Sequence, residues 1–142
     1  MERFRQMAKF LGIAVILAGL VGSGCAGPKP KSGGVLPCAP DSRIEKTIAA
    51  EAELVDFSCV FKPWEGVNAL HFNVTLKNVS SVPQRYKVNI FLDNGKAVGG
   101  LIPRTTKKGL VEPGQTASFT YPVGGMTTAP QSILLMVKTI AH

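Results

Sequence analysis

The chain has 142 residues, of which 16 are Lys or Arg and 9 are Asp or Glu, and its formal net charge is +7. It contains only two histidines and three cysteines, so it has few of the groups from which acid–base pairs, activated nucleophiles and metal sites are built. This composition argues against an enzyme, and we expect no catalytic residue, no metal and no cofactor.

The first 24 residues have the pattern of a secretory signal peptide. Arg3, Arg5 and Lys9 give a positively charged start, and every residue from 10 to 21 is apolar or glycine. A membrane-spanning helix needs roughly 20 apolar residues, so this run is too short to be a permanent span. We therefore predict that residues 1–24 are removed after export.

A cysteine follows this apolar run in the sequence Val21-Gly22-Ser23-Gly24-Cys25. The stretch resembles the lipobox of bacterial lipoproteins. The resemblance implies a diacylglyceryl group on the Cys25 sulfur, cleavage just before Cys25 and acylation of the new α-amine. Several acyl chains on one residue anchor a protein stably to a membrane. The alternative is an ordinary signal peptide whose cysteine is coincidental.

The residues after Cys25 indicate the membrane to which the lipoprotein would be sorted. Ala26 and Gly27 stand where many Gram-negative lipoproteins that stay in the inner membrane have an aspartate, so the family rule implies the outer membrane, with the domain facing the periplasm. Removing residues 1–24 lowers the net charge from +7 to +5. This charge would suit anionic lipid headgroups, lipopolysaccharide or peptidoglycan carboxylates, but the lysines are scattered as on an ordinary solvated surface. Export also disfavours a nucleic-acid partner.

Lipidation of Cys25 would leave Cys38 and Cys59 as a pair. We expect a disulfide between them because the envelope is oxidising. Closing a loop of about 20 residues would contribute about 3 kcal/mol in the chain-entropy model. The alternative is two free thiols in a small core.

The chain after the signal peptide divides into two parts. Residues 25–36 are predicted to be the lipidated cysteine and a flexible tether, because the segment is rich in Pro, Gly, Lys and Ser and has no apolar period. Residues 37–142 are long enough for one domain with a single core but not for two.

Alternation of apolar and polar residues predicts most strands of this domain. Residues 53–62, 70–77 and 85–92 alternate in this way, and we expect the last two runs to be antiparallel neighbours. Residues 93–96 predict a tight hairpin into a strand at 97–102. Residues 112–115 predict a turn before a strand at 116–123, with Phe119 and Tyr121 on one face. Residues 43–50 fit a strand or a short helical turn, and the apolar run at 132–140 is typical of a central strand covered on both sides.

Six or seven strands with regularly spaced turns predict an all-β antiparallel sandwich. The segments L-H-F-N-V-T-L-K-N-V-S-S (residues 70–81), Y-K-V-N-I-F-L-D-N-G-K (86–96) and V-E-P-G-Q-T-A-S-F-T-Y (111–121) resemble immunoglobulin-like or fibronectin-like sandwiches. The order of their turns is similar to that in small YcfL-type envelope lipoproteins. The resemblance implies a sandwich of about seven strands after a cleaved signal peptide, and it implies no particular function.

Two segments are candidate binding surfaces. Trp64, the only tryptophan, falls in a predicted loop, where it either contacts a partner or caps one end of the sandwich. Arg104, Lys107 and Lys108 form a short basic loop that either meets lipid headgroups or a glycan or remains solvated.

Other polar or flexible positions are given structural roles. His71 is expected to be solvated on the polar face of its strand, and Gly99-Gly100 are expected at a bend or in a flexible loop. Glu51, Glu53 and Asp56 are close in sequence but are expected to be an ordinary solvated strand entry.

We therefore expect a non-enzymatic, membrane-anchored envelope lipoprotein whose sandwich is a binding or assembly module for another envelope protein. The alternative is a lipoprotein that binds a glycan such as peptidoglycan, or a small ligand, with Trp64 and the basic loop as contacts.

Overall fold

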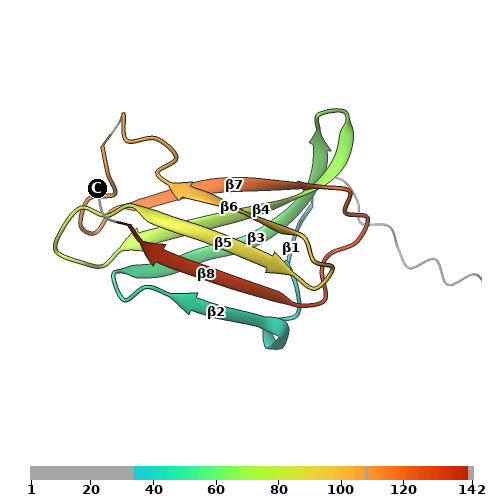
Figure 1. The fold of residues 1–142 in the computed structure, drawn as a ribbon, viewed down its shortest axis with the longest axis horizontal. Helices are drawn as coiled ribbons and strands as arrows, with labels where there is room; N and C mark the ends of the chain where they lie inside the picture. The colour runs from blue at the N-terminus through green and yellow to red at the C-terminus, as the bar shows by residue number, and fades with distance from the viewer. Residues whose placement is uncertain (1–33, 108, 141–142) are drawn as a thin grey trace, which may run out of the picture.

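The computed structural model describes residues 34–107 and 109–140, which form two four-stranded β-sheets packed face to face (Figure 1). The signal peptide, Cys25 and most of the expected tether lie outside the described residues, as does Lys108. The strands are β1 (Val35–Leu36), β2 (Ile44–Ile48), β3 (Ala52–Trp64), β4 (Val67–Asn78), β5 (Tyr86–Leu92), β6 (Ala97–Ile102), β7 (Thr116–Gly124) and β8 (Ile133–Thr139). Among these residues the chain has no helix with the length and apolar character that crossing a membrane requires.

The predicted all-β sandwich is confirmed, with eight strands rather than about seven. The first sheet has the order β1-β3-β4-β7, and all its pairs are antiparallel. The second sheet has the order β2-β8-β5-β6. It is mixed rather than wholly antiparallel, because β2 and β8 run parallel.

The core lies between the two sheets and follows from the alternation of each strand. In β4 the side chains that point inward are fully buried, namely Leu70, Phe72, Val74 and Leu76. They belong to one cluster with the inward side chains of β5 and β8, namely Val88, Ile90, Leu135 and Val137. Burying each such side chain contributes roughly 1.5–3 kcal/mol, so these alternating positions hold the sandwich together.

The expected pairing of the strands at 70–77 and 85–92 is wrong, because β4 and β5 lie in different sheets. The connection between them starts at Asn78, whose side chain is fully buried. Asn78 Nδ2 donates to the carbonyl oxygens of Val82 and Val111, each at 2.8 Å, and its Oδ1 accepts from the Ser80 N–H at 2.9 Å. These bonds fix the connecting segment, which crosses from the first sheet to the second. Alternation alone does not predict this crossing.

Residues 43–50 were expected to form either a strand or a short helical turn, and this region contains both. A 3₁₀ turn, η1 (Asp41–Arg43), leads directly into the edge strand β2. The tether expected over residues 25–36 is shorter at its carboxyl end, because Val35 and Leu36 pair with Val60 and Cys59 of β3.

The apolar run at 132–140 forms β8, which is central in its sheet because it pairs with both β2 and β5. It is not covered on both sides as expected. Ile133, Leu135 and Val137 are buried, whereas Leu134 and Met136 are only half-buried on the outer face. The continuous apolar run therefore leaves an exposed apolar surface on the second sheet.

Two tight hairpins lie at the same end of the sandwich (Figure 1). The predicted turn at residues 93–96 is confirmed, with Gly95 at a φ of 80° between β5 and β6. The β3–β4 hairpin turns on Glu65 and Gly66, whose φ angles are 49° and 80°, as in a two-residue turn that needs positive φ at both positions. This hairpin rises away from the sandwich at one end of the molecule (Figure 1). Trp64 is therefore the last residue of β3 and does not lie in a loop.

Candidate functional site

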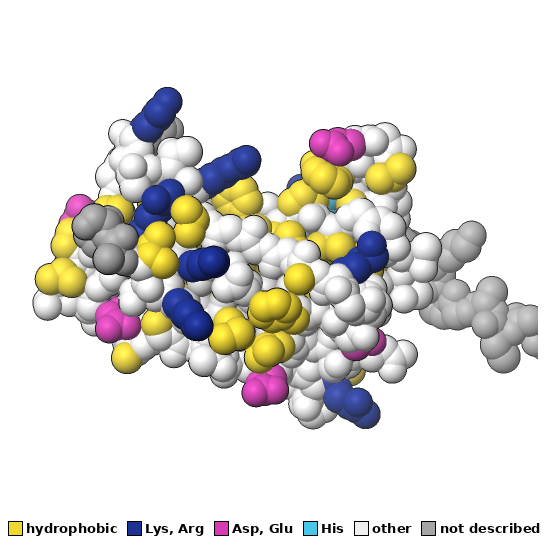
Figure 2. All heavy atoms as spheres, in the orientation of Figure 1, with side chains coloured by type: hydrophobic (Ala, Val, Ile, Leu, Met, Phe, Trp, Pro, Cys, Tyr) yellow, Lys and Arg dark blue, Asp and Glu magenta, His cyan; other side chains and the backbone are white. Residues whose placement is uncertain are grey.

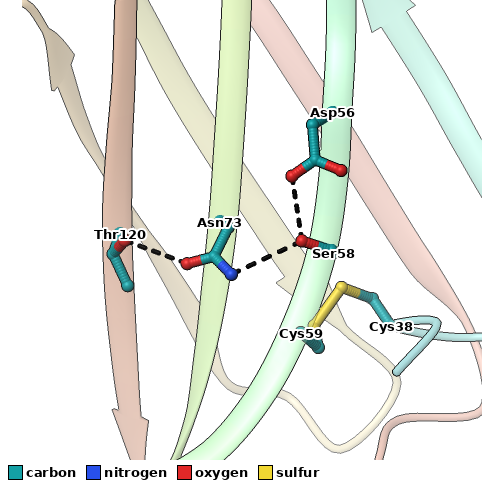
Figure 3. Close-up of a disulfide and its surroundings, with 6 residues drawn as sticks. All are labelled: Cys38, Asp56, Ser58, Cys59, Asn73 and Thr120. Atoms are coloured by element: carbon teal, nitrogen blue, oxygen red, sulfur yellow. Dashed lines mark hydrogen bonds between the residues drawn. A yellow bond between two sulfur atoms is a disulfide. The ribbon is translucent and has the colours of Figure 1, made fainter. Parts of the chain in front are cut away.

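The predicted disulfide is confirmed. Cys38 and Cys59 are bonded, their Cα atoms are 5.0 Å apart, and both are buried (Figure 3). Because Cys59 lies in β3, the bond fastens the beginning of the domain to the first sheet.

Polar side chains next to Cys59 form a chain of hydrogen bonds across the outer face of the first sheet (Figure 3). Thr120 Oγ1 donates to Asn73 Oδ1 at 2.9 Å, and Asn73 Nδ2 donates to Ser58 Oγ at 3.4 Å. Ser58 Oγ donates in turn to Asp56 Oδ2 at 2.9 Å. The chain ends at the Asp56 carboxylate and links β7, β4 and β3, so these groups support the sheet.

A groove lies between the β3–β4 hairpin and the loop that follows β6, with β6 and β7 between them. We call it the hairpin groove. Figure 2 shows the surface hollowed between these two projections. The groove has a volume of about 580 Å³ and is open to solvent. It is lined by residues of β3, β4, β6 and β7 and by Arg104 from the loop.

Aromatic side chains line two sides of the hairpin groove. Trp64 stands on the hairpin side and is 40% exposed. Phe119 and Tyr121 point to the same side of β7, as predicted, with ring centroids 4.8 Å apart. The Arg104 guanidinium lies over the Phe119 ring, 5.5 Å from its centroid, within the range of a cation–π contact. A flat, apolar ring face on Trp64 therefore stands across the groove from a positioned cation.

A second cation, Lys62, lines the groove from β3. Within the described part of the chain, neither Lys62 nor Arg104 forms an ion pair with a carboxylate. The backbone at Arg104 is held in place by Arg85, whose Nε donates to the Pro103 carbonyl at 3.2 Å and whose Nη2 donates to the Arg104 carbonyl at 2.9 Å. The groove thus presents two exposed positive charges with no carboxylate partner among the described residues.

The expectation that His71 is solvated is wrong, because the side chain is only 4% exposed. His71 pairs with Val60 on one side and Pro122 on the other, so apolar residues flank it on the otherwise polar face of β4. Its Nδ1–H donates to the Ala69 carbonyl at 3.1 Å. Burial lowers the pKa of His71, the Ala69 hydrogen bond opposes this shift, and the nearby Lys62 charge adds to it. His71 therefore lines the groove as a neutral imidazole at pH 7.

Tyr121 lines the same groove but is 2% exposed, and its hydroxyl is buried. Among the described residues, no group forms a hydrogen bond with this hydroxyl. Burial raises the pKa of Tyr121 well above its usual range. Leaving a buried hydroxyl unpaired costs about 1–3 kcal/mol, so this position next to the groove is energetically expensive.

Gly99 and Gly100 lie in β6 rather than at a bend, and they line the groove. A Cβ on Gly99 would collide with the Val88 carbonyl oxygen, and one on Gly100 would lie 3.1 Å from Tyr121 Cε1. Close packing between strands therefore requires glycine at position 99, whereas a side chain at position 100 would press against the Tyr121 ring. Because β6 is the edge of its sheet, the outward backbone groups of this side-chain-free stretch have no strand partner.

The groove brings together two residues that the sequence marked as candidates, Trp64 and Arg104. Lys107 is exposed but does not line the groove, and Lys108 and Cys25 lie outside the described residues. Sequence reasoning missed Lys62 and Phe119, since an exposed lysine and an inward aromatic carry no signal of their own in an alternating strand.

The outer face of the second sheet is a separate surface. Phe91 is 43% exposed and pairs with Leu134 on one side and Ala97 on the other. With the half-buried Met136 these side chains form what we call the outer apolar patch. Figure 2 shows hydrophobic side chains gathered over β5 and β8, beside basic side chains.

In the part of the chain that the structure describes, no three His, Cys, Asp or Glu side chains are grouped so that they could hold a metal ion. The chain matches none of the protein-family models, and neither a curated protein nor a solved structure is significantly similar to it. Function is therefore inferred from the chain's own groove and surfaces.

Proposed function

We propose that this protein is a non-enzymatic lipoprotein of the bacterial envelope, anchored through Cys25, and that its sandwich binds an envelope component in the hairpin groove. The observation that carries the proposal is the presence of Trp64, Lys62 and Arg104 around one open groove. An exposed aromatic ring and unneutralised cations give affinity for an anionic or amphipathic partner. The side chains that line the groove include no carboxylate that would act as a general acid or base.

The anchor supports this role, because a lipidated protein stays at the membrane and presents its groove to whatever lies within reach. The test is Cys25→Ser, which is expected to leave an unlipidated precursor that no longer partitions with membranes. Normal processing and unchanged partitioning would contradict the anchor. Sucrose-gradient separation of inner and outer membranes would then test the expected outer-membrane location.

The groove itself is testable because Trp64 is the only tryptophan in the chain. The intrinsic fluorescence of the protein therefore reports on the groove. We expect purified sacculi, lipopolysaccharide or a detergent extract of envelope proteins to shift the Trp64 emission. Val79→Ala, at an exposed site in the link after β4, is a matched control that should respond like the native chain. If no envelope fraction changes the emission, the proposal is wrong.

A second candidate function is assembly with another envelope protein through the outer apolar patch. The observation that favours it is the exposure of Phe91 beside Leu134 and Met136 on a sheet face, since exposed apolar patches mark protein contacts. A photo-crosslinking residue placed at position 91 in living cells should capture a protein, whereas one at position 79 should not. Equal yields at both positions would argue against this candidate.

A further inference from the structure

We propose that the ligand of the hairpin groove is an acidic sugar, that is, a pyranose ring that bears a carboxylate or a phosphate group. This inference rests on the proposed function, because it names the class of ligand that the groove would take. Three features of the groove carry it, and each matches a different part of such a ligand.

The first feature is Trp64. Its side chain is 40% exposed at the end of β3, and a Cβ on Gly124 of β7 would lie 4.0 Å from its Cζ3. The ring is therefore seated against the sheet on one side and open to the groove on the other. The aliphatic C–H face of a pyranose packs on such a ring, because the ring is flat, large and only partly solvated.

The second feature is the pair of cations. Lys62 extends from β3 beside His71, and Arg104 stands on the loop side over Phe119. Stacking on Phe119 occupies the face of the guanidinium and leaves its N–H groups at the edge free to bind an anion. Burial and the neighbouring Lys62 lower the pKa of His71, so the lysine and the arginine are the cations that face the ligand at neutral pH. Each would form a charge-assisted hydrogen bond with an acidic group.

The third feature is the stretch formed by Gly99 and Gly100. The two glycines present backbone rather than side chains to the groove, on an edge strand whose outward N–H and C=O groups are unpaired by any strand. Sugar hydroxyls both donate and accept hydrogen bonds, so backbone groups of this kind suit them. An aromatic platform, two cations and open backbone together match a sugar ring with a negative charge better than they match a neutral sugar or a purely apolar molecule.

The test uses the full-length protein in detergent and follows Trp64 emission during titration with defined sugars. A disaccharide that contains N-acetylmuramic acid supplies the carboxylate, glucosamine phosphate supplies the phosphate, and chitobiose is the neutral control. We expect saturable shifts with the acidic sugars, and an affinity for chitobiose that is at least about tenfold weaker. The acidic sugar that binds more tightly identifies the source, a peptidoglycan glycan strand whose lactyl carboxylates carry no stem peptide, or a phosphorylated glycolipid.

Lys62→Gln and Arg104→Gln should each weaken binding of the acidic sugar by about tenfold, which is the loss of one charge-assisted contact. Lys46→Gln makes the same change of charge on β2, at the opposite edge of the second sheet from β6, and should leave the affinity unchanged. Equal binding of neutral and acidic sugars, or equal losses in all three variants, would overturn the inference. If an envelope fraction shifts the emission but no sugar does, the ligand class is wrong and the groove remains a binding site. If nothing shifts it, the proposed function fails as well.

Discussion

Replacing Tyr121 with phenylalanine should make the protein more stable. The Tyr121 hydroxyl is buried without a hydrogen-bond partner among the described residues, while its ring packs 4.8 Å from that of Phe119. Phenylalanine keeps the ring and removes only the unpaired group. Because an orphaned hydroxyl costs about 1–3 kcal/mol, we expect the free energy of unfolding to rise by about 1 kcal/mol. For a domain of this size that corresponds to an increase in Tm of roughly 4–8 °C.

The chain provides a matched control in its only other tyrosine. Tyr86 is also buried, but its hydroxyl donates to the Glu51 carbonyl at 2.9 Å. Tyr86→Phe should therefore lower the free energy of unfolding by about 1 kcal/mol, the typical value of one net hydrogen bond. Urea unfolding followed by circular dichroism measures both variants. If Tyr121→Phe is destabilised as much as Tyr86→Phe, the Tyr121 hydroxyl has a partner and the reasoning is refuted.

Three further predictions concern the rest of the fold. Replacing Cys38 and Cys59 together with alanine should cost about 3 kcal/mol, because the disulfide closes a loop with a sequence separation of 21; a loss below about 1 kcal/mol in urea unfolding would contradict this. Asn78→Ala leaves buried carbonyl oxygens without donors and should lower the free energy of unfolding by about 3 kcal/mol in the same assay. An unchanged free energy would mean that the segment after β4 keeps its conformation without these hydrogen bonds. His71 has a lowered pKa in the folded state, so its unfolded form binds more protons and stability should fall as the pH drops below about 6.5; His71→Gln should lose less stability between pH 7.5 and 5.5 than the native chain does, and parallel pH profiles would argue against it.

Much of the fold was predictable because most strands have one wet face. In β4 and β5, the apolar residues at every second position identify the buried side directly. Alternation does not encode which strand lies next to which, so the sequence alone predicts that β4 pairs with β5, although the two strands belong to opposite sheets. The deciding feature is the buried Asn78, whose four hydrogen bonds reach both ways into the connecting segments.

The candidate site was predictable only in part. Trp64 and Arg104 stood out because a lone tryptophan and a short basic run are unusual in this chain, and the fold places both around one groove. The burial of His71 cannot be predicted from alternation, because the residues that flank it, Val60 and Pro122, lie on neighbouring strands and are distant in sequence. Lys62 lines the groove because of the position that the pairing of β3 with β4 gives it. That pairing becomes known only with the fold.

The disulfide also determines how the domain responds to mechanical load. A pull on the chain at Val35 first shears the short β1–β3 pairing, and the tension then reaches the covalent link at Cys38. From there it passes directly into Cys59 in the middle of β3, so residues 39–58, including all of β2, carry no load. Because β3 continues from Cys59 to Trp64, the tension then enters the strand that supports the groove.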